Sequence, residues 1–199
     1  EWFLNLGKAN NGGPKCFSVS GHVQKPGNYE LPLGTPFRDM LAVAGGLRPG
    51  RQLKAVIPGG SSMPVLPASV MMDITMDFDA LQKAGSGLGS GAVIIMDDST
   101  CMVRALTRIS RFYYHESCGQ CTPCREGTGW MYRVLKRISD GQGREDDLHL
   151  LKSAAGQIEG HTICAFGEAA AWPVQGMLRH FWSEFEYYVK NKRSMVDDA

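Results

Sequence analysis

The chain has 199 residues, of which 43% are hydrophobic and 21% charged, and its formal net charge is +1. This composition is typical of a globular chain, and the length allows one large domain or two small ones. The balanced charge lacks the basic surplus of nucleic-acid-binding proteins, so we expect no nucleic acid as a partner. The longest apolar run, residues 92–96, is far shorter than the ~20 residues that span a bilayer, so we expect no membrane insertion.

The beginning of the chain, residues 1–14, predicts a linker remnant. It has neither the basic start nor the apolar core of a secretory signal. We therefore expect a cytoplasmic protein, and the missing initiator Met indicates a fragment.

A small α+β domain is predicted over residues 15–100. Period-two alternation over 16–23 and a Pro26-Gly27 turn indicate a β-hairpin. Thr35 is expected to cap a helix that begins at Pro36 and ends at two glycines. Three further strands are expected, at 53–57, 63–66 and 92–96. A hairpin, a helix and later strands suggest a small β-grasp domain.

Two glycine-rich stretches in this region, 59–62 and 85–91, are predicted as turns. A dinucleotide-binding loop follows a strand and opens a helix, whereas the second stretch leads into a strand. Neither predicts a nucleotide site.

The second half, residues 101–199, is predicted as an all-α domain of four helices. Trp130 is expected on an inner helix face, and Pro173 in the first turn of the last helix. Short connections between such helices favour a bundle. The predicted helices cover residues 103–115, 127–139, 146–160 and 173–190.

Four of the six cysteines are predicted to bind a [4Fe–4S] cluster. Cys118, Cys121 and Cys124 are three residues apart and can face one centre if the chain winds at about three residues per turn. Cys164 supplies the remote fourth thiolate, and C-x2-C-x2-C with a distant Cys is typical of such clusters. The isolated Cys16 and Cys101 are predicted to be buried small hydrophobes.

Zinc is the competing metal, because four thiolates can also hold it tetrahedrally. Its structural sites draw ligands as two separated pairs, which a close triplet matches poorly. A zinc-stabilised protein-binding module is therefore the alternative from another functional class.

Two neighbouring side chains are candidates for tuning the cluster. Arg125 could supply positive charge to an anionic cluster, or could pair with Glu126 or Glu116. His161 could replace a ligand, although a supporting role near the cluster is favoured.

The cysteine segments resemble the flavoprotein (F-type) subunit of NADH:quinone oxidoreductase, respiratory complex I. The likeness rests on HESCGQCTPCREG at 115–127 and EGHTICAFGEAAAWPVQGMLRHF at 159–181, and VIPGGSSMPVLP at 56–67 reinforces it. Residues 19–46 resemble the soluble-ligand-binding β-grasp (SLBB) domain of that subunit. The chain is identified as its C-terminal half, because the glycine-rich and acidic residues that bind FMN and NADH have no counterpart.

The resemblance implies an oxidoreductase that works by electron relay. FMN takes a hydride from NADH, and the [4Fe–4S] cluster takes single electrons from FMNH2 and passes them to further clusters toward quinone. FMN and NADH would bind only to the full-length subunit, so the fragment alone is not expected to oxidise NADH. Ala165 and Phe166 would lie near the flavin edge.

The resemblance also implies partners and a location. The partners would be other subunits of the peripheral arm, notably the [2Fe–2S] subunit and the large iron–sulfur subunit. The location would be the cytoplasmic face of the inner membrane, or the matrix side in mitochondria. Diaphorase subunits of NAD-reducing hydrogenases and NAD-dependent formate dehydrogenases remain the alternative, because they share the cysteine motif and the β-grasp domain.

Overall fold

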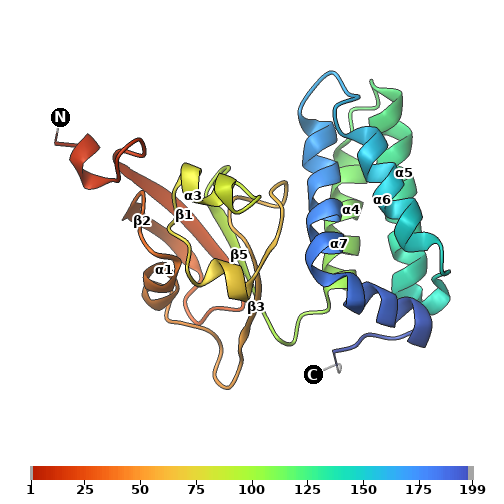
Figure 1. Ribbon diagram of the computed structural model, residues 1–199, viewed down its shortest axis with the longest axis horizontal. Helices are drawn as coiled ribbons and strands as arrows, with labels where there is room; N and C mark the ends of the chain where they lie inside the picture. Colours follow the sequence, from red (N-terminus) through yellow and green to blue (C-terminus); the bar gives the residue numbers. More distant parts are fainter. Residues whose placement is uncertain (1, 197–199) are drawn as a thin grey trace. The chain divides into compact units, whose positions relative to one another are not determined.

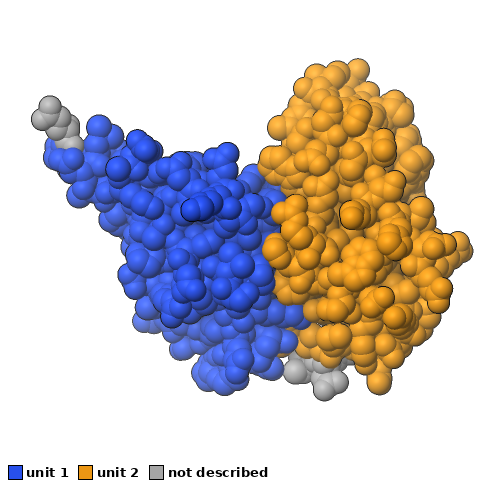
Figure 2. Space-filling view, viewed as in Figure 1, with its two compact units in different colours: residues 1–98 blue, residues 99–199 orange. Residues whose placement is uncertain are grey.

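A computed structural model describes residues 2–196, so residue 1 and residues 197–199, at the outer ends of the predicted regions, lie outside the described residues. The chain divides into two compact units, residues 1–98 and residues 99–199 (Figure 2). Figure 1 shows the strands in the first unit and the long helices in the second. This arrangement confirms the predicted α+β class.

A mixed five-stranded sheet forms the centre of the first unit, with the strand order β2-β1-β5-β3-β4 (Figure 1). The predicted hairpin is confirmed, because β1 and β2 pair antiparallel with Phe17 opposite Tyr29. The central pair β1 and β5 is parallel, which is the β-grasp arrangement. The strands are β1 (Pro14–Gly21), β2 (Gly27–Pro32), β3 (Leu53–Ile57), β4 (Leu66–Pro67) and β5 (Ala92–Asp97).

Short helices accompany this sheet, and the side chains of Phe37 and Met40 are fully buried in the core against residues such as Phe17 and Ile95. Burying several large apolar side chains is the main source of stability for a unit of this size. The helices are η1 (Leu4–Leu6), α1 (Phe37–Val43), α2 (Ala68–Met71) and α3 (Phe78–Lys83).

Two predictions of local structure in this unit are wrong. Pro36 has an extended ψ of 139°, so α1 begins one residue later, at Phe37. The Thr35 hydroxyl donates to the carbonyl of Pro32 at 2.7 Å instead of capping the helix. The strand predicted from residue 63 begins only at Leu66, because the Met63 amide closes a turn with the Gly60 carbonyl at 2.9 Å.

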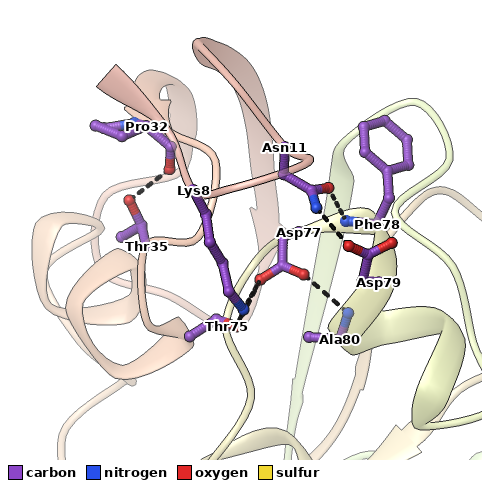
Figure 3. A network of polar contacts seen from close by, with 9 residues as sticks. All are labelled: Lys8, Asn11, Pro32, Thr35, Thr75, Asp77, Phe78, Asp79 and Ala80. Atoms are coloured by element: carbon purple, nitrogen blue, oxygen red, sulfur yellow. Dashed lines mark hydrogen bonds and ion pairs between the residues drawn. The ribbon is translucent and has the colours of Figure 1, made fainter. Parts of the chain in front are cut away.

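A network of polar contacts joins the residues before β1 to the start of α3 (Figure 3). Asp77 is fully buried and accepts from the Ala80 amide at 2.8 Å and from Lys8 Nζ at 3.2 Å. Asn11 bonds Asp79 at 2.8 Å and accepts from the Phe78 amide at 2.9 Å. The side chain of Asp77 thus caps α3 and also holds the early chain in place.

The two glycine-rich stretches lie directly against each other. A Cβ atom on Gly59 would lie 2.3 Å from the Gly87 carbonyl oxygen, and one on Gly89 would lie 2.2 Å from the Gly59 oxygen. The Ser90 amide donates to the Gly59 carbonyl at 3.1 Å. Both stretches are turns, as predicted, and the glycines allow the two backbones to approach closely.

The helices α4, α5, α6 and α7 pack together in the second unit (Figure 1), as the predicted helical domain requires. Helix α4 packs on α5 and α7, and α6 packs on the same two helices. Fully buried apolar side chains such as Leu106, Leu135, Leu151 and Phe185 come from all four. The elements are α4 (Met102–Glu116), α5 (Thr122–Arg137), the π-helical η2 (Ile138–Gln142), α6 (Asp147–Ile158) and α7 (Phe166–Asn191).

The second helix of this unit differs from the prediction in its start and in its buried face. It begins at Thr122, five residues earlier than expected, with Pro123 in its first turn, a position that does not need the missing N–H. Trp130 is 58% exposed, so the inner position predicted for it is wrong. Met131 and Leu135 face the core instead.

The last helix begins seven residues before Pro173, so the first-turn position predicted for that proline is wrong. Pro173 is buried inside α7, where it lacks the N–H of one helical hydrogen bond. A kink lies further along, at Phe181, with φ −127° and ψ 25°. No helix within residues 2–196 is long and apolar enough to cross a membrane.

Candidate metal centre

Three of the candidate cysteines lie where α4 ends and α5 begins. Residues 117–121 are not helical, and Gly119 has a φ of +80° that turns the chain. Cys121 is the N-cap residue of α5, and Cys124 lies in its first turn. The three cysteines therefore do not lie on one continuous winding of three residues per turn, because only Cys124 is helical.

The fourth cysteine, Cys164, lies in the loop between α6 and α7, which comes close to this segment. The Ile163 amide donates to the sulfur of Cys121 at 3.3 Å, although the two residues are 42 positions apart. The structure thus brings the loop that carries Cys164 to the three-cysteine segment.

The cysteines differ in exposure, and Cys124 alone among these four is buried, at 6% exposure. The Ser117 hydroxyl lies 3.2 Å from its sulfur. The Thr128 hydroxyl donates to the Cys124 carbonyl at 2.7 Å and so holds the first turns of α5. Cys118 and Cys164 are exposed, and Cys121 is half-buried.

The four thiols interact electrostatically. Burial raises the pKa of the Cys124 thiol, and negative charge on Cys118, Cys164 and Cys121 raises it further, while the Ser117 hydroxyl opposes both effects. A positive group bound among the four would favour their thiolate forms, because it reverses this repulsion.

The donor set is suited to an iron–sulfur cluster. In a [4Fe–4S] cubane each of the four irons takes one thiolate. Cys124 interacts electrostatically with the other three cysteines, and thiolates are the soft ligands that iron–sulfur clusters require.

Two helices begin at this site. Cys121 is the N-cap residue of α5, and Cys164 directly precedes Ala165, the N-cap residue of α7. The N-terminus of a helix carries a partial positive charge and unpaired amides, so both ends favour the negatively charged thiolate forms of the nearby cysteines.

The two predicted tuning residues lie beside the cysteines but have other partners. Arg125 pairs with Glu126 at 3.1 Å and donates to the Gly119 carbonyl at 2.8 Å, so it braces the loop between Cys118 and Cys121. His161 is exposed, and its Nδ1 lies 2.8 Å from the Glu159 carbonyl oxygen.

The predicted flavin-edge residues begin the last helix. Ala165 is its N-cap residue, and the ring of Phe166 packs edge-on against Tyr113 of α4, with ring centroids 5.5 Å apart. This packing fixes the first turn of α7 on the bundle.

The remaining two cysteines belong to other elements of the chain. Cys16 is exposed on β1, so its predicted burial is wrong, and Cys101 is half-buried before α4. Cys16 alternates with the buried Phe17 and so faces out of the core.

Sequence reasoning missed two residues that contact sulfurs of the candidate cysteines, Ser117 and Ile163. The serine directly precedes the first cysteine, and a hydroxyl beside a cysteine motif is a signal that could have identified it. Ile163 makes its contact through the backbone amide, which every residue type except proline has, so the sequence gives no signal for it.

Comparisons with known proteins agree with the division of the chain. Residues 104–188 match the NADH-ubiquinone oxidoreductase-F iron-sulfur binding region, which confirms the predicted iron–sulfur domain. Residues 16–66 match the SLBB domain, as the resemblance implied.

Similar curated proteins cover nearly the whole chain. The F-type subunit of NADH-quinone oxidoreductase in Rickettsia typhi (strain ATCC VR-144 / Wilmington) is 53% identical over 193 residues, which is 96% of this chain and 46% of that protein. The same subunit in Rickettsia conorii (strain ATCC VR-613 / Malish 7) is 54% identical over 193 residues, which is again 96% of this chain and 46% of that protein. The chain thus spans about half the length of these relatives.

A solved structure shares the fold. It is the crystal structure of NAD+-reducing [NiFe]-hydrogenase in the H2-reduced state, 33% identical with a TM-score of 0.84, and the match covers 94% of this chain and 32% of that one. The curated relatives are more similar in sequence, and their similarity extends over both units. The chain thus contains the NADH-ubiquinone oxidoreductase-F iron-sulfur binding region and an SLBB domain, and over nearly its whole length it is similar to F-type subunits of NADH-quinone oxidoreductase.

Proposed function

We propose that this chain is the electron-relay portion of an NADH-oxidising flavoprotein subunit, with a [4Fe–4S] cluster bound by Cys118, Cys121, Cys124 and Cys164. The observation that carries the proposal is the contact between the Ile163 amide and the Cys121 sulfur at 3.3 Å. It joins the two cysteine segments inside the region that matches an iron–sulfur family.

Such a cluster, when bound, supplies transfer of one electron at a time without making bonds to a substrate. The residues of this chain hold its position and exclude water on one side. Cys124 anchors the buried side on α5, and Phe166 fixes the start of α7 against Tyr113. Rigid ligands of this kind limit the rearrangement that accompanies a change of charge.

The electron donor in this proposal is FMN reduced by NADH, bound by a part of the subunit that the chain does not span. Support comes from the names of the relatives, which are subunits of NADH-quinone oxidoreductases, and from the share of their length that is matched. The resemblance to the F-type subunit implies that Ala165 and Phe166, which follow Cys164, would lie toward the flavin.

The acceptors would be iron–sulfur clusters of partner subunits, namely the [2Fe–2S] subunit and the large iron–sulfur subunit of a peripheral arm. That arm would lie at the cytoplasmic face of the inner membrane, or on the matrix side in mitochondria. The relatives are named as one subunit of a larger enzyme, which supports a multisubunit assembly.

A diaphorase subunit of an NAD-reducing hydrogenase is the second candidate. The structural likeness to an NAD+-reducing [NiFe]-hydrogenase favours it. The identity to that protein is 33%, against 53% to the relative in Rickettsia typhi, so we prefer the quinone oxidoreductase.

Anaerobic reconstitution with iron and sulfide tests the ligand set. The parent chain should bind about four irons, absorb in the visible range and show an EPR signal on reduction by dithionite. Cys164→Ser should lose this cluster or degrade it to a three-iron form. Cys16→Ser, which removes an exposed thiol of the other unit, should behave like the parent.

The opposite results would refute the proposal. A colourless parent chain with one stoichiometric zinc would show a zinc module instead. A normal four-iron cluster in Cys164→Ser would remove Cys164 from the ligand set.

A further inference from the structure

The hydroxyl of Ser117 lies 3.2 Å from the sulfur of Cys124, across the turn between α4 and α5. Contacts to sulfur extend to about this distance or slightly beyond, because sulfur is larger than oxygen. The hydroxyl oxygen also accepts from the Gly119 amide at 3.4 Å. Ser117 therefore lies between a backbone donor and a ligand sulfur.

The charge state of the sulfur sets the direction of the hydrogen bond. The Gly119 amide occupies one lone pair of the serine oxygen, and the hydroxyl hydrogen stays available to the sulfur. A cysteine bound to iron is a thiolate and can only accept. The Ser117 hydroxyl then donates to the Cys124 sulfur.

A hydrogen bond to the buried Cys124 sulfur should affect the cluster more strongly than one to an exposed cysteine. Cys124 is 6% exposed, whereas Cys118 and Cys164 are exposed, so water can hydrogen-bond to their sulfurs more readily. A protein donor at the buried sulfur has no ready replacement in solvent.

We propose that Ser117 is a positioning residue that raises the reduction potential of the cluster through its hydrogen bond to Cys124. The inference rests on the proposed function, since it requires a cluster on these cysteines. A [4Fe–4S] cluster with four thiolates gains one negative charge on reduction, and hydrogen bonds to its sulfurs stabilise the more negative form. Loss of the hydroxyl should therefore favour the oxidised form.

The test is an EPR-monitored redox titration of the reconstituted full chain. Ser117→Ala should reduce the equilibrium constant for one-electron reduction about threefold to tenfold, which lowers the midpoint potential by about 28 to 59 mV. Ser117→Thr keeps the hydroxyl and should restore the parent potential.

Thr122→Val is the matched control, because it removes a hydroxyl from the same segment. The Thr122 hydroxyl is exposed and accepts from Arg125 at 3.4 Å. Its loss should leave the potential at the parent value.

The outcomes separate this inference from the proposed function. A parent chain without a four-iron cluster refutes the proposed function. A parent with the cluster and a Ser117→Ala variant of equal potential refutes the inference alone. Loss of the cluster in Ser117→Ala but not in Ser117→Thr supports a hydrogen bond from the hydroxyl to the Cys124 sulfur. Loss of the cluster in both variants shows that only the shape of residue 117 matters and overturns the inference.

Discussion

The guanidinium of Arg137 at the end of α5 holds the carboxylate of Asp147 at the start of α6, with Nε 3.1 Å from Oδ2. The Arg144 amide donates to the same carboxylate at 2.9 Å. Asp147 is fully buried, while 28% of the Arg137 side chain is exposed. The pair thus links two helices of the bundle across the break at Gly141, which has a φ of +75°.

Asp147→Asn should lower the free energy of unfolding by about 2–4 kcal/mol, because breaking a buried ion pair leaves one charge without compensation. Urea unfolding followed by circular dichroism measures the loss. Asp140→Asn is the control: it breaks the exposed pair with Lys136 and should leave stability almost unchanged. Equal effects of both variants would show that burial of Asp147 contributes nothing.

The stability of the first unit should depend on pH, because Asp77 titrates differently in the folded and unfolded chain. Burial alone would raise the pKa of Asp77, but the Thr75 hydroxyl, the Ala80 amide and Lys8 together hold it below the ordinary value of 3.8. The unfolded chain therefore binds this proton first, and the stabilisation is present above about pH 4 and lost as pH falls through the lower, folded-state pKa.

Asp77→Asn removes this dependence, so the stability gap between parent and variant should be wide at pH 6 and narrower at pH 3. The Ala80 amide donates a hydrogen bond to Asp77, so hydrogen exchange at this amide reports the stability gap locally. Asp73→Asn, in an exposed pair with Arg38, should show little gap at either pH. A gap for Asp77→Asn that widens on acidification would contradict the assignment.

The contact between the glycine-rich turns predicts a steric effect. Gly59→Ala would place a methyl group 2.3 Å from a backbone oxygen, so the turns must separate, at a cost of about 1–3 kcal/mol in unfolding free energy. Gly27→Ala is the control, since its nearest neighbour would be 3.7 Å away. Thermal unfolding of both variants measures this cost. A Gly59→Ala variant as stable as Gly27→Ala would refute the close approach of the two glycine-rich turns.

Removal of the cluster should expose the cysteines unequally. In the chelator-treated chain, iodoacetamide should modify the exposed Cys118 and Cys164 well before the buried Cys124. With the cluster bound, all three should be protected while the exposed Cys16 still reacts. Mass spectrometry after timed quenching measures the order, and early labelling of Cys124 would contradict its burial.

Patterns with a strong local cause were predictable from the sequence. The alternation that produces β1 and the apolar run of β5 determined those strands, and the cysteine spacing identified a metal-binding segment. The errors arose where tertiary contacts decide. Trp130 has the size of a core residue, yet it is exposed and Met131 lies on the buried face of α5. Proline is usually found in the first turn of a helix, but Pro173 lies inside α7 because the helix begins seven residues earlier.

The candidate cysteines could be identified from their spacing, but the contacts around them could not. The contact of Ser117 with Cys124 depends on the left-handed turn at Gly119, which no spacing rule describes. The contact of the Ile163 amide depends on how α6 and α7 pack. Both are consequences of the folded backbone rather than of a motif.

The distance of 42 residues between Cys121 and Ile163 also sets an order of events in folding. Closing a loop of this length costs chain entropy, so we expect the loop that carries Cys164 to reach the three-cysteine segment only when α6 has docked. Cluster assembly therefore reports on bundle formation, and a mutation in α6 far from any sulfur can prevent it.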